Sequence, residues 1–194
     1  MKRKWGYTAI LFAAMHTIPL TADTSGIENS VLFNQLSLAA AIQAAQVSIS
    51  HCRKEGHHVS ATVVDRFGQS QVMLRDTEAS PISAELSHKK AYTAANFNKN
   101  TKQLANLSNT AIGRTEGVLM SAGGVLIKVD DTIYGAVGVS GAETGAIDDA
   151  CAMEGASIIV EALKAEKKKP EVKAKLNAEK ISKSVNRNNQ QDTH

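Results

Sequence analysis

The fold is decided by residues 123–141, whose sequence is GGVLIKVDDTIYGAVGVSG. Two runs rich in Val and Ile flank the turn residues Asp130 and Asp131. This pattern predicts a β-hairpin, because β-branched residues favour strands and Asp favours turns. Gly135 and Gly138 interrupt the second run. Glycine inside a strand marks a bulge or the close approach of another backbone, so we expect one of these features in this strand.

A second hairpin is expected upstream, over residues 58–65 and 69–75. Its first run contains the β-branched sequence TVV, and the sequence DRFG over residues 65–68 supplies a turn that contains glycine. Strands joined by tight turns run antiparallel, so the two hairpins predict an antiparallel sheet.

Helices are expected on either side of each hairpin. Over residues 34–55, apolar side chains recur every three or four positions, as in an amphipathic helix, and Gly56 marks its end. A second helix is expected over residues 81–98, capped by Ser80, and a third over residues 146–163. Together these elements predict an α/β fold with a central antiparallel sheet flanked by helices.

The N-terminal segment predicts export. Residues 2–4 are basic, residues 5–20 are mostly apolar but too short to span a membrane, and Thr21-Ala22 offers a small-residue cleavage site. Residues 1–22 are therefore interpreted as a signal peptide and residues 23–33 as a linker, with an uncleaved N-terminal anchor as the alternative. Either interpretation places the domain outside the cytosol, so we expect the protein to be periplasmic or secreted.

Composition argues against several classes of protein. The net charge is +3, but the basic residues gather at the two ends, and residues 23–163 are mildly acidic. Aromatic content is only 4%, which argues against nucleic acid binding through stacked bases. Beyond the N-terminal segment, no apolar stretch is long enough for a transmembrane span. Residues 164–194 are rich in Lys, Asn and Gln, which predicts a basic tail that is disordered or weakly helical.

Five motifs occur in the order known from one protein family. They are VVDRFG at residues 63–68, KAYTA at 90–94, GGV at 123–125, GAVGVSG at 135–141 and DDACA at 148–152. Over residues 34–163 the chain resembles the GlcG/HbpS-like family, which includes the C-terminal domain of PduO-type proteins. The resemblance implies a profilin-like α/β sandwich, assembly into homo-oligomers and, as in some exported members, haem binding.

The resemblance also implies which residues contact haem. Some family members place a haem-ligating histidine close to the position of His51, so His51 is the candidate iron ligand. Thr93 lies in the KAYTA segment, where the resemblance implies haem contact, and His88 lies beside that segment. A solvent-facing or hydrogen-bonded histidine is the alternative for both His51 and His88.

Two further groups are candidates for binding an anion. Lys90 and Thr93 share one face of the second helix because they are three residues apart, and together they can hold a haem propionate or a small carboxylate. The backbone N–H groups between Gly138 and Gly141 can face an anion near the start of the last helix. The alternatives are a lysine that snorkels to the surface and a tightly packed strand end where only glycine fits.

The two cysteines, Cys52 and Cys151, fall on predicted helix faces among apolar neighbours. This setting favours two buried thiols. A disulfide, which an oxidising compartment permits, and a thiolate that contacts haem stay open as alternatives.

The leading hypothesis is an exported haem-binding protein that acts in haem storage, sequestration or redox sensing. The alternative is an enzyme or accessory protein that acts on a small hydroxy- or oxo-acid, with Lys90 binding the carboxylate and Asp65 or Asp148 as the base. No nucleophile–base pair can be recognised in the sequence, so a binding protein is favoured over an enzyme.

Overall fold

The computed structural model describes residue 31 and residues 33–191, with side chains through residue 169. The chain divides into two compact units, Met1–Phe33 and Asn34–His194, and every element below belongs to the second unit. The predicted signal peptide at residues 1–22 and nearly all of the predicted linker lie outside the described residues.

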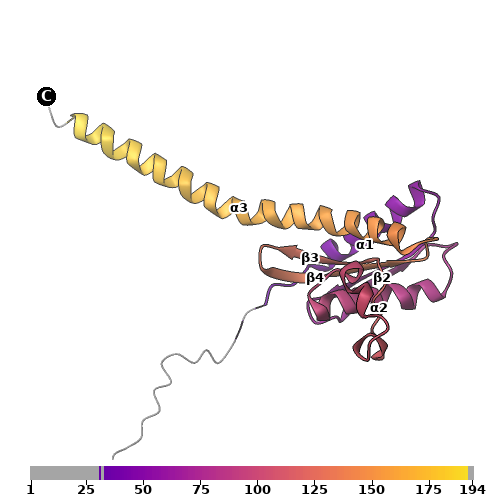
Figure 1. Ribbon diagram of the computed structural model, residues 1–194. Coiled ribbons are helices and arrows are strands. Elements are labelled where there is room, and N and C mark those ends of the chain that lie inside the picture. The colour runs from indigo at the N-terminus through magenta and orange to yellow at the C-terminus, as the bar shows by residue number, and fades with distance from the viewer. Residues whose placement is uncertain (1–30, 32, 192–194) are drawn as a thin grey trace, which may run out of the picture. The chain divides into compact units, whose positions relative to one another are not determined.

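Two antiparallel hairpins form one four-stranded sheet (Figure 1). Its strands are β1 (Ser60–Asp65), β2 (Ser70–Arg75), β3 (Gly124–Val129) and β4 (Thr132–Ser140). Each hairpin pairs its own two strands, and β1 pairs with β4, which gives the order β2-β1-β4-β3. All of these pairs are antiparallel, so the predicted antiparallel sheet is confirmed.

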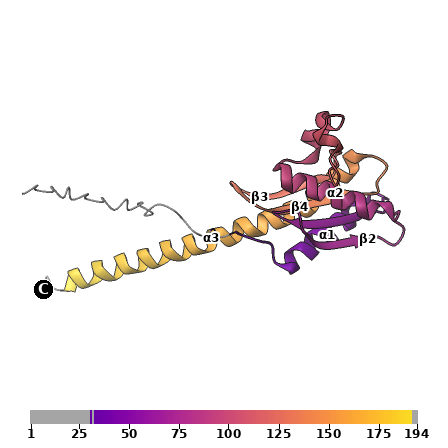
Figure 2. The same ribbon diagram turned by 90° about the horizontal axis from the view of Figure 1, so that it is seen from below.

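Helices cover both faces of this sheet. They are α1 (Leu38–Lys54), α2 (Ile82–Phe97) and α3 (Gly145–Gln191), with the short 3₁₀ helices η1 (Thr101–Leu107) and η2 (Ile112–Arg114) between α2 and β3. α1 and α3 pack against each other on one face, whereas α2 lies on the other face (Figures 1 and 2). The predicted α/β sandwich with flanking helices is therefore confirmed.

The larger hydrophobic core lies between the sheet and the pair α1 and α3. Ala61 and Val63 of β1 belong to it, because alternate residues of a strand face the same side. Small residues let the two helices approach closely. A Cβ atom added to Gly155 of α3 would overlap the carbonyl oxygen of Ala44 in α1.

The opposite face of the sheet meets α2 through hydroxyl groups and small side chains. The Ser60 hydroxyl lies 2.7 Å from that of Ser83, and the Thr62 hydroxyl lies 2.7 Å from that of Ser87. The smaller apolar cluster on this side contains Val64, Ala91, Ala94, Ala95 and Ala136. Hydrogen bonds and close contact therefore hold α2 to its face of the sheet. On the other face, large apolar side chains hold α1 and α3.

The glycines of β4 permit close contact with α2 and with the neighbouring strand β1. A Cβ atom at Gly138 would overlap the carbonyl oxygen of Ser87 and would lie 2.6 Å from the backbone nitrogen of Ala91. At Gly135 a Cβ atom would overlap the carbonyl oxygen of Val64. The predicted close approach of a neighbouring backbone at the β4 glycines is confirmed.

A disulfide joins Cys52 of α1 to Cys151 of α3, so the interpretation of two buried thiols is wrong. The two Cα atoms are 5.5 Å apart, within the range that a disulfide requires. Periodicity placed each cysteine correctly on the buried stripe of its own helix. It carries no information on the distance between two helices that are far apart in the sequence.

Two predicted helix starts need correction. α1 begins at Leu38 rather than at residue 34, because the Ser37 side chain accepts a hydrogen bond from the Ala40 N–H at 3.2 Å and caps the helix there. α2 has Pro81 as its N-terminal cap and no side-chain capping bond, so the predicted cap by Ser80 is wrong.

The last helix is longer than expected. α3 does not end at Leu163 but continues to Gln191, through most of the segment for which a disordered or weakly helical tail is predicted. The assignment of residues 164–194 as a separate tail stays a prediction. Among the residues that the structure describes, none of the helices is long and apolar enough to cross a membrane.

Candidate functional site

An open cleft of about 450 Å³ lies between the C-terminal end of α1 and the first turns of α3. Its lining residues are His51, Glu55, His57, Ala146, Ile147, Ala150 and Cys151. Both histidines are half-buried. α1 ends at Lys54, and Gly56 adopts a positive φ of 82°, which turns the chain back so that the His57 N–H donates to the Cys52 carbonyl at 2.9 Å.

This turn gives the cleft two imidazoles and an apolar wall. The candidate ligand His51 comes from the helix, and His57 follows the glycine turn. His57 was not among the site residues predicted from the sequence. The local signal that could have found it is the glycine between the two histidines, because a turn there returns the chain toward the helix end.

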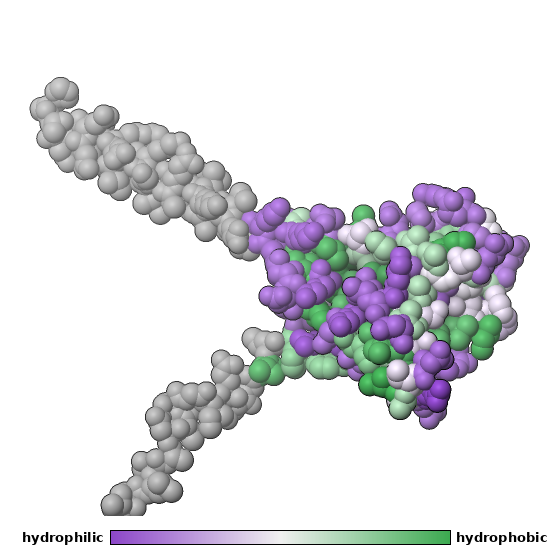
Figure 3. Space-filling view, viewed as in Figure 1, coloured by the Kyte–Doolittle hydropathy of each residue, from purple (hydrophilic) through white to green (hydrophobic). Residues whose placement is uncertain are grey.

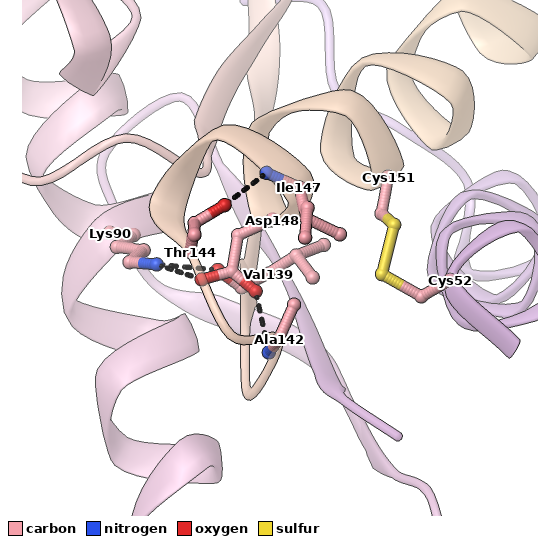
Figure 4. Close-up of a disulfide and its surroundings, with 8 residues drawn as sticks. All are labelled: Cys52, Lys90, Val139, Ala142, Thr144, Ile147, Asp148 and Cys151. Atoms are coloured by element: carbon pink, nitrogen blue, oxygen red, sulfur yellow. Dashed lines mark hydrogen bonds and ion pairs between the residues drawn. A yellow bond between two sulfur atoms is a disulfide. The ribbon is translucent and has the colours of Figure 1, made fainter. Parts of the chain in front are cut away.

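A buried ion pair lies beside the start of α3 (Figure 4). The Lys90 Nζ lies 2.7 Å from Oδ2 of Asp148 and donates to the Val139 carbonyl at 3.0 Å. The other oxygen of Asp148 accepts the Ala142 N–H at 3.1 Å. Burial raises the pKa of Asp148, while Lys90, the Ala142 N–H and nearby His57 act in the opposite direction.

These contacts explain the paired aspartates of the DDACA motif. Asp148 ties the start of α3 to α2 through Lys90, and Asp149 accepts the Gly123 N–H at 3.3 Å. A Cβ atom at Gly123 would lie 2.9 Å from the Lys90 Nζ, so glycine leaves room for the ammonium group. The sequence did not predict this ion pair, because Lys90 and Asp148 are 58 positions apart.

Lys90 and Thr93 are not brought together around a shared ligand. Thr93 is fully buried, donates from its hydroxyl to the Lys89 carbonyl at 2.7 Å, and accepts the Leu119 N–H at 2.8 Å. The Lys90 ammonium meets Asp148 instead. The side chains of Lys90 and Thr93, both predicted to bind an anion, thus have hydrogen-bond partners within the fold. Haem contact at Thr93 stays a prediction.

The remaining predicted residues are dispersed. His88 is half-buried on α2, with its ring centroid 6.2 Å from that of Tyr92, and the sheet separates α2 from the helix that carries His51. Gly138 lies inside the sheet, paired with β1 and β3. Gly141 lies in the exposed connection between β4 and α3, with a φ of 127°.

Within the described residues, no group of three or more His, Cys, Asp or Glu side chains is arranged to hold a bare metal ion. The porphyrin of haem supplies four of the iron's ligands, so a haem protein needs only one or two axial side chains. The His51 and His57 cleft meets that smaller requirement.

Comparisons with known proteins agree on one family. The family model described as "Haem degrading protein HbpS-like" matches residues 36–157. Protein GlcG of Escherichia coli K12 is 33% identical over 117 residues, which cover 59% of this chain and 85% of GlcG. An uncharacterised 15.0 kDa protein of Citrobacter freundii is 29% identical over 113 residues, or 55% of this chain and 80% of that protein.

Solved structures give the same result. A double mutant of Streptomyces reticuli HbpS matches with a TM-score of 0.62 and 33% identity, over 74% of this chain and 97% of that chain. The PduOC:Heme complex shares the fold, with a TM-score of 0.58 at 23% identity, over 63% of this chain and 94% of that chain. The chain belongs to the HbpS-like family.

Proposed function

We propose that this protein binds haem in the cleft between α1 and α3. The observation that carries the proposal is the pair of half-buried histidines, His51 and His57, set against an apolar wall. A volume of about 450 Å³ lies within the range of small-molecule sites. The matching family is described as haem-degrading, and one protein of the same fold was solved as a haem complex, which supports the choice of ligand.

The chemistry of the cleft suits the two parts of haem. A neutral imidazole of His51 or His57 would hold the iron, which supplies the redox and ligand-binding chemistry of the cofactor. Ala146, Ile147 and Ala150 offer apolar surface for the macrocycle. The start of α3 lies at the same cleft, and the positive end of a helix dipole favours carboxylates such as the propionates.

Titration of the mature protein with haemin, followed by the Soret band, tests this proposal. We expect saturable binding that His51→Ala or His57→Ala weakens tenfold or more, because loss of an axial ligand removes at least about 1.4 kcal/mol. His88→Ala is the matched control, since His88 lies on the opposite face of the sheet.

A loss of affinity in the His88 variant equal to that in the His51 variant would move the site to α2. Absence of a saturable Soret change would refute haem binding altogether. Thermal unfolding of each variant verifies that the fold is intact.

We also propose that the protein is exported. The disulfide between Cys52 and Cys151 supports this, because such bonds persist in oxidising compartments and are rare in the cytosol. Fractionation of cells that express the full chain tests the proposal. Recovery of the protein only in the cytosol, with the cysteines reduced, would refute it.

Self-association is proposed as well. Large apolar side chains are exposed on both helices of one face, including Leu38 on α1 and Met153 and Ile158 on α3. Figure 3 shows hydrophobic patches among hydrophilic side chains on one side of the molecule. Light scattering after size-exclusion chromatography tests this, and a monomer mass at all concentrations would refute it.

The alternative of a small-acid enzyme at Lys90 is not favoured by this geometry. To bind a substrate, Lys90 would first have to move away from Asp148, which would leave the buried Asp148 carboxylate without its partner. Asp65, the other base considered, uses its carboxylate to accept the N–H groups of Phe67 and Gln69 in the β1–β2 turn.

A further inference from the structure

A second cleft, of about 480 Å³, lies on another flank of α1, where that helix meets the end of β2. Ser50 and Arg53 of α1 and Arg75 and Thr77 around the end of β2 line it. On α1, residues 50 and 53 point about 100° or more away from His51, because successive residues of a helix turn by 100°. The second cleft is therefore separate from the histidine cleft.

Arg53 is fixed in this cleft by a buried carboxylate. Its Nε donates to Oδ2 of Asp76 at 3.0 Å and its Nη2 donates to Oδ1 at 2.9 Å. The hydrogen bond from Arg53 is the main cause that lowers the pKa of Asp76 to about 2, so Asp76 is ionised at neutral pH. A bidentate pair uses two of the five guanidinium N–H groups and leaves the others for a further acceptor.

The charges around the cleft leave an excess of positive charge on its wall. Arg53 and Arg75 line it together with one carboxylate, that of Asp76. His58 also contacts Asp76, at 3.3 Å, and Glu78 binds the other ring nitrogen of His58 at 2.9 Å. Glu78 does not line the cleft, and its carboxylate pairs with His58, so it is not counted in the charge of the cleft wall.

The cleft also offers hydroxyl groups and an apolar floor. The side chains of Ser50 and Thr77 line it, and neither makes a side-chain hydrogen bond to another described residue. Ile49 and Leu74 supply hydrocarbon surface beneath them. Two guanidinium groups, two free hydroxyls and a small apolar floor are complementary to a short carbon chain with a carboxylate and a hydroxyl.

We propose that the cleft bounded by Arg53 and Arg75 is a second ligand site, which binds a small hydroxycarboxylic acid. The carboxylate would accept from the N–H groups of Arg53 that Asp76 does not use. It would also accept from the N–H groups of Arg75 other than the Nη1 hydrogen that Arg75 donates to the Ala79 carbonyl at 2.6 Å. The hydroxyl would exchange hydrogen bonds with Ser50 or Thr77. Charge-assisted hydrogen bonds to a preorganised arginine are the strong ones, whereas the open cleft leaves most of a small ligand hydrated. We therefore expect dissociation constants on the order of 1 mM.

Calorimetric titration of the mature protein with lactate tests the proposal, with acetate and propane-1,2-diol as partial ligands. Lactate is expected to bind saturably, acetate more weakly, and the uncharged diol not at all. Arg75→Gln is expected to weaken lactate binding about tenfold, because it removes a charge-assisted hydrogen bond to the carboxylate. The double variant Ser50→Ala/Thr77→Ala is expected to weaken it by a similar factor, because it removes the partners of the lactate hydroxyl. Arg114→Gln is the control, because Arg114 is exposed and lies outside the cleft.

Absence of saturable lactate binding at concentrations around a hundred times the expected constant would overturn the proposal. An equal loss in the Arg114 variant would also overturn it, because it would indicate general charge attraction. His51→Ala separates the two ligand sites. It is expected to leave lactate binding unchanged, whether or not it alters haem binding.

Discussion

Removal of the Cys52–Cys151 disulfide is expected to destabilise this fold strongly. The bond joins residues 99 positions apart. In the chain-entropy treatment, opening a closed loop of about 100 residues raises the entropy of the unfolded chain enough to cost about 4.7 kcal/mol at 25 °C. For a domain of this size that loss lowers the melting temperature by on the order of 15 °C.

Urea unfolding of the oxidised protein and of the variants Cys52→Ala and Cys52→Ala/Cys151→Ala measures this loss. The single and the double variant both lack the bond, but only the double variant loses the second buried sulfur. If the lost cross-link is the cause, the two variants lose similar amounts, within about 1 kcal/mol. Reduction of the wild type in urea, followed by refolding under reductant, should reproduce the same value.

A loss below about 1 kcal/mol in every case would refute this reasoning. It would mean that contacts between the segments of α1 and α3 persist in the unfolded state and already restrict the chain, so that the disulfide adds little stability. A large loss in the double variant alone would instead assign the effect to packing around the sulfur atoms.

Three further predictions concern stability. Lys90→Met should destabilise the protein by about 3–5 kcal/mol in urea, because it leaves Asp148 buried without its partner, and adding Asp148→Leu should recover a large part of that loss. Asp76, whose pKa is lowered from 3.8 to about 2, should contribute stability above pH 3.8 that is lost as the pH falls toward 2. We expect this contribution to the free energy of unfolding to be about 1–2 kcal/mol, less than the pKa shift alone implies, because solvent screens the exposed arginine partner. An Asp76→Asn variant whose stability falls with decreasing pH as much as that of the wild type would contradict this prediction. Gly138→Ala should lower stability by about 1–3 kcal/mol through overpacking against α2, whereas Gly145→Ala, with its nearest contact at 3.3 Å, should change thermal unfolding little.

Local sequence patterns were sufficient to predict the two hairpins and the existence of the three helices. The turn residues Asp130 and Asp131 and the adjacent β-branched runs lie next to each other in the sequence, so one short window contains all the information. Gly135 and Gly138 indicated a bulge or the close approach of another backbone, and the backbone of α2 does approach Gly138. These features depend on contacts within a few residues, or on a steric need that only glycine meets.

Contacts between distant segments could not be predicted in the same way. The disulfide and the Lys90–Asp148 pair join residues whose separation in space depends on the whole fold. The same reason explains why Lys90 and Thr93 were expected to share a ligand, since their helical spacing is correct but their partners come from α3 and from the segment before β3. Arg53 was overlooked because its role depends on Asp76, which lies 23 positions further along the chain, after both β1 and β2.

The hydroxyl pairs between β1 and α2 have a consequence for how the molecule opens. Detaching α2 would expose hydroxyls and small side chains, whereas separating α1 and α3 from the sheet would expose the large apolar cluster. Exposure of apolar surface raises the heat capacity of unfolding, and exposure of polar surface lowers it. We therefore expect the amides of α2 to exchange with deuterium through a sub-global opening of lower free energy and small heat-capacity change, while those of α1 exchange only when the whole domain unfolds.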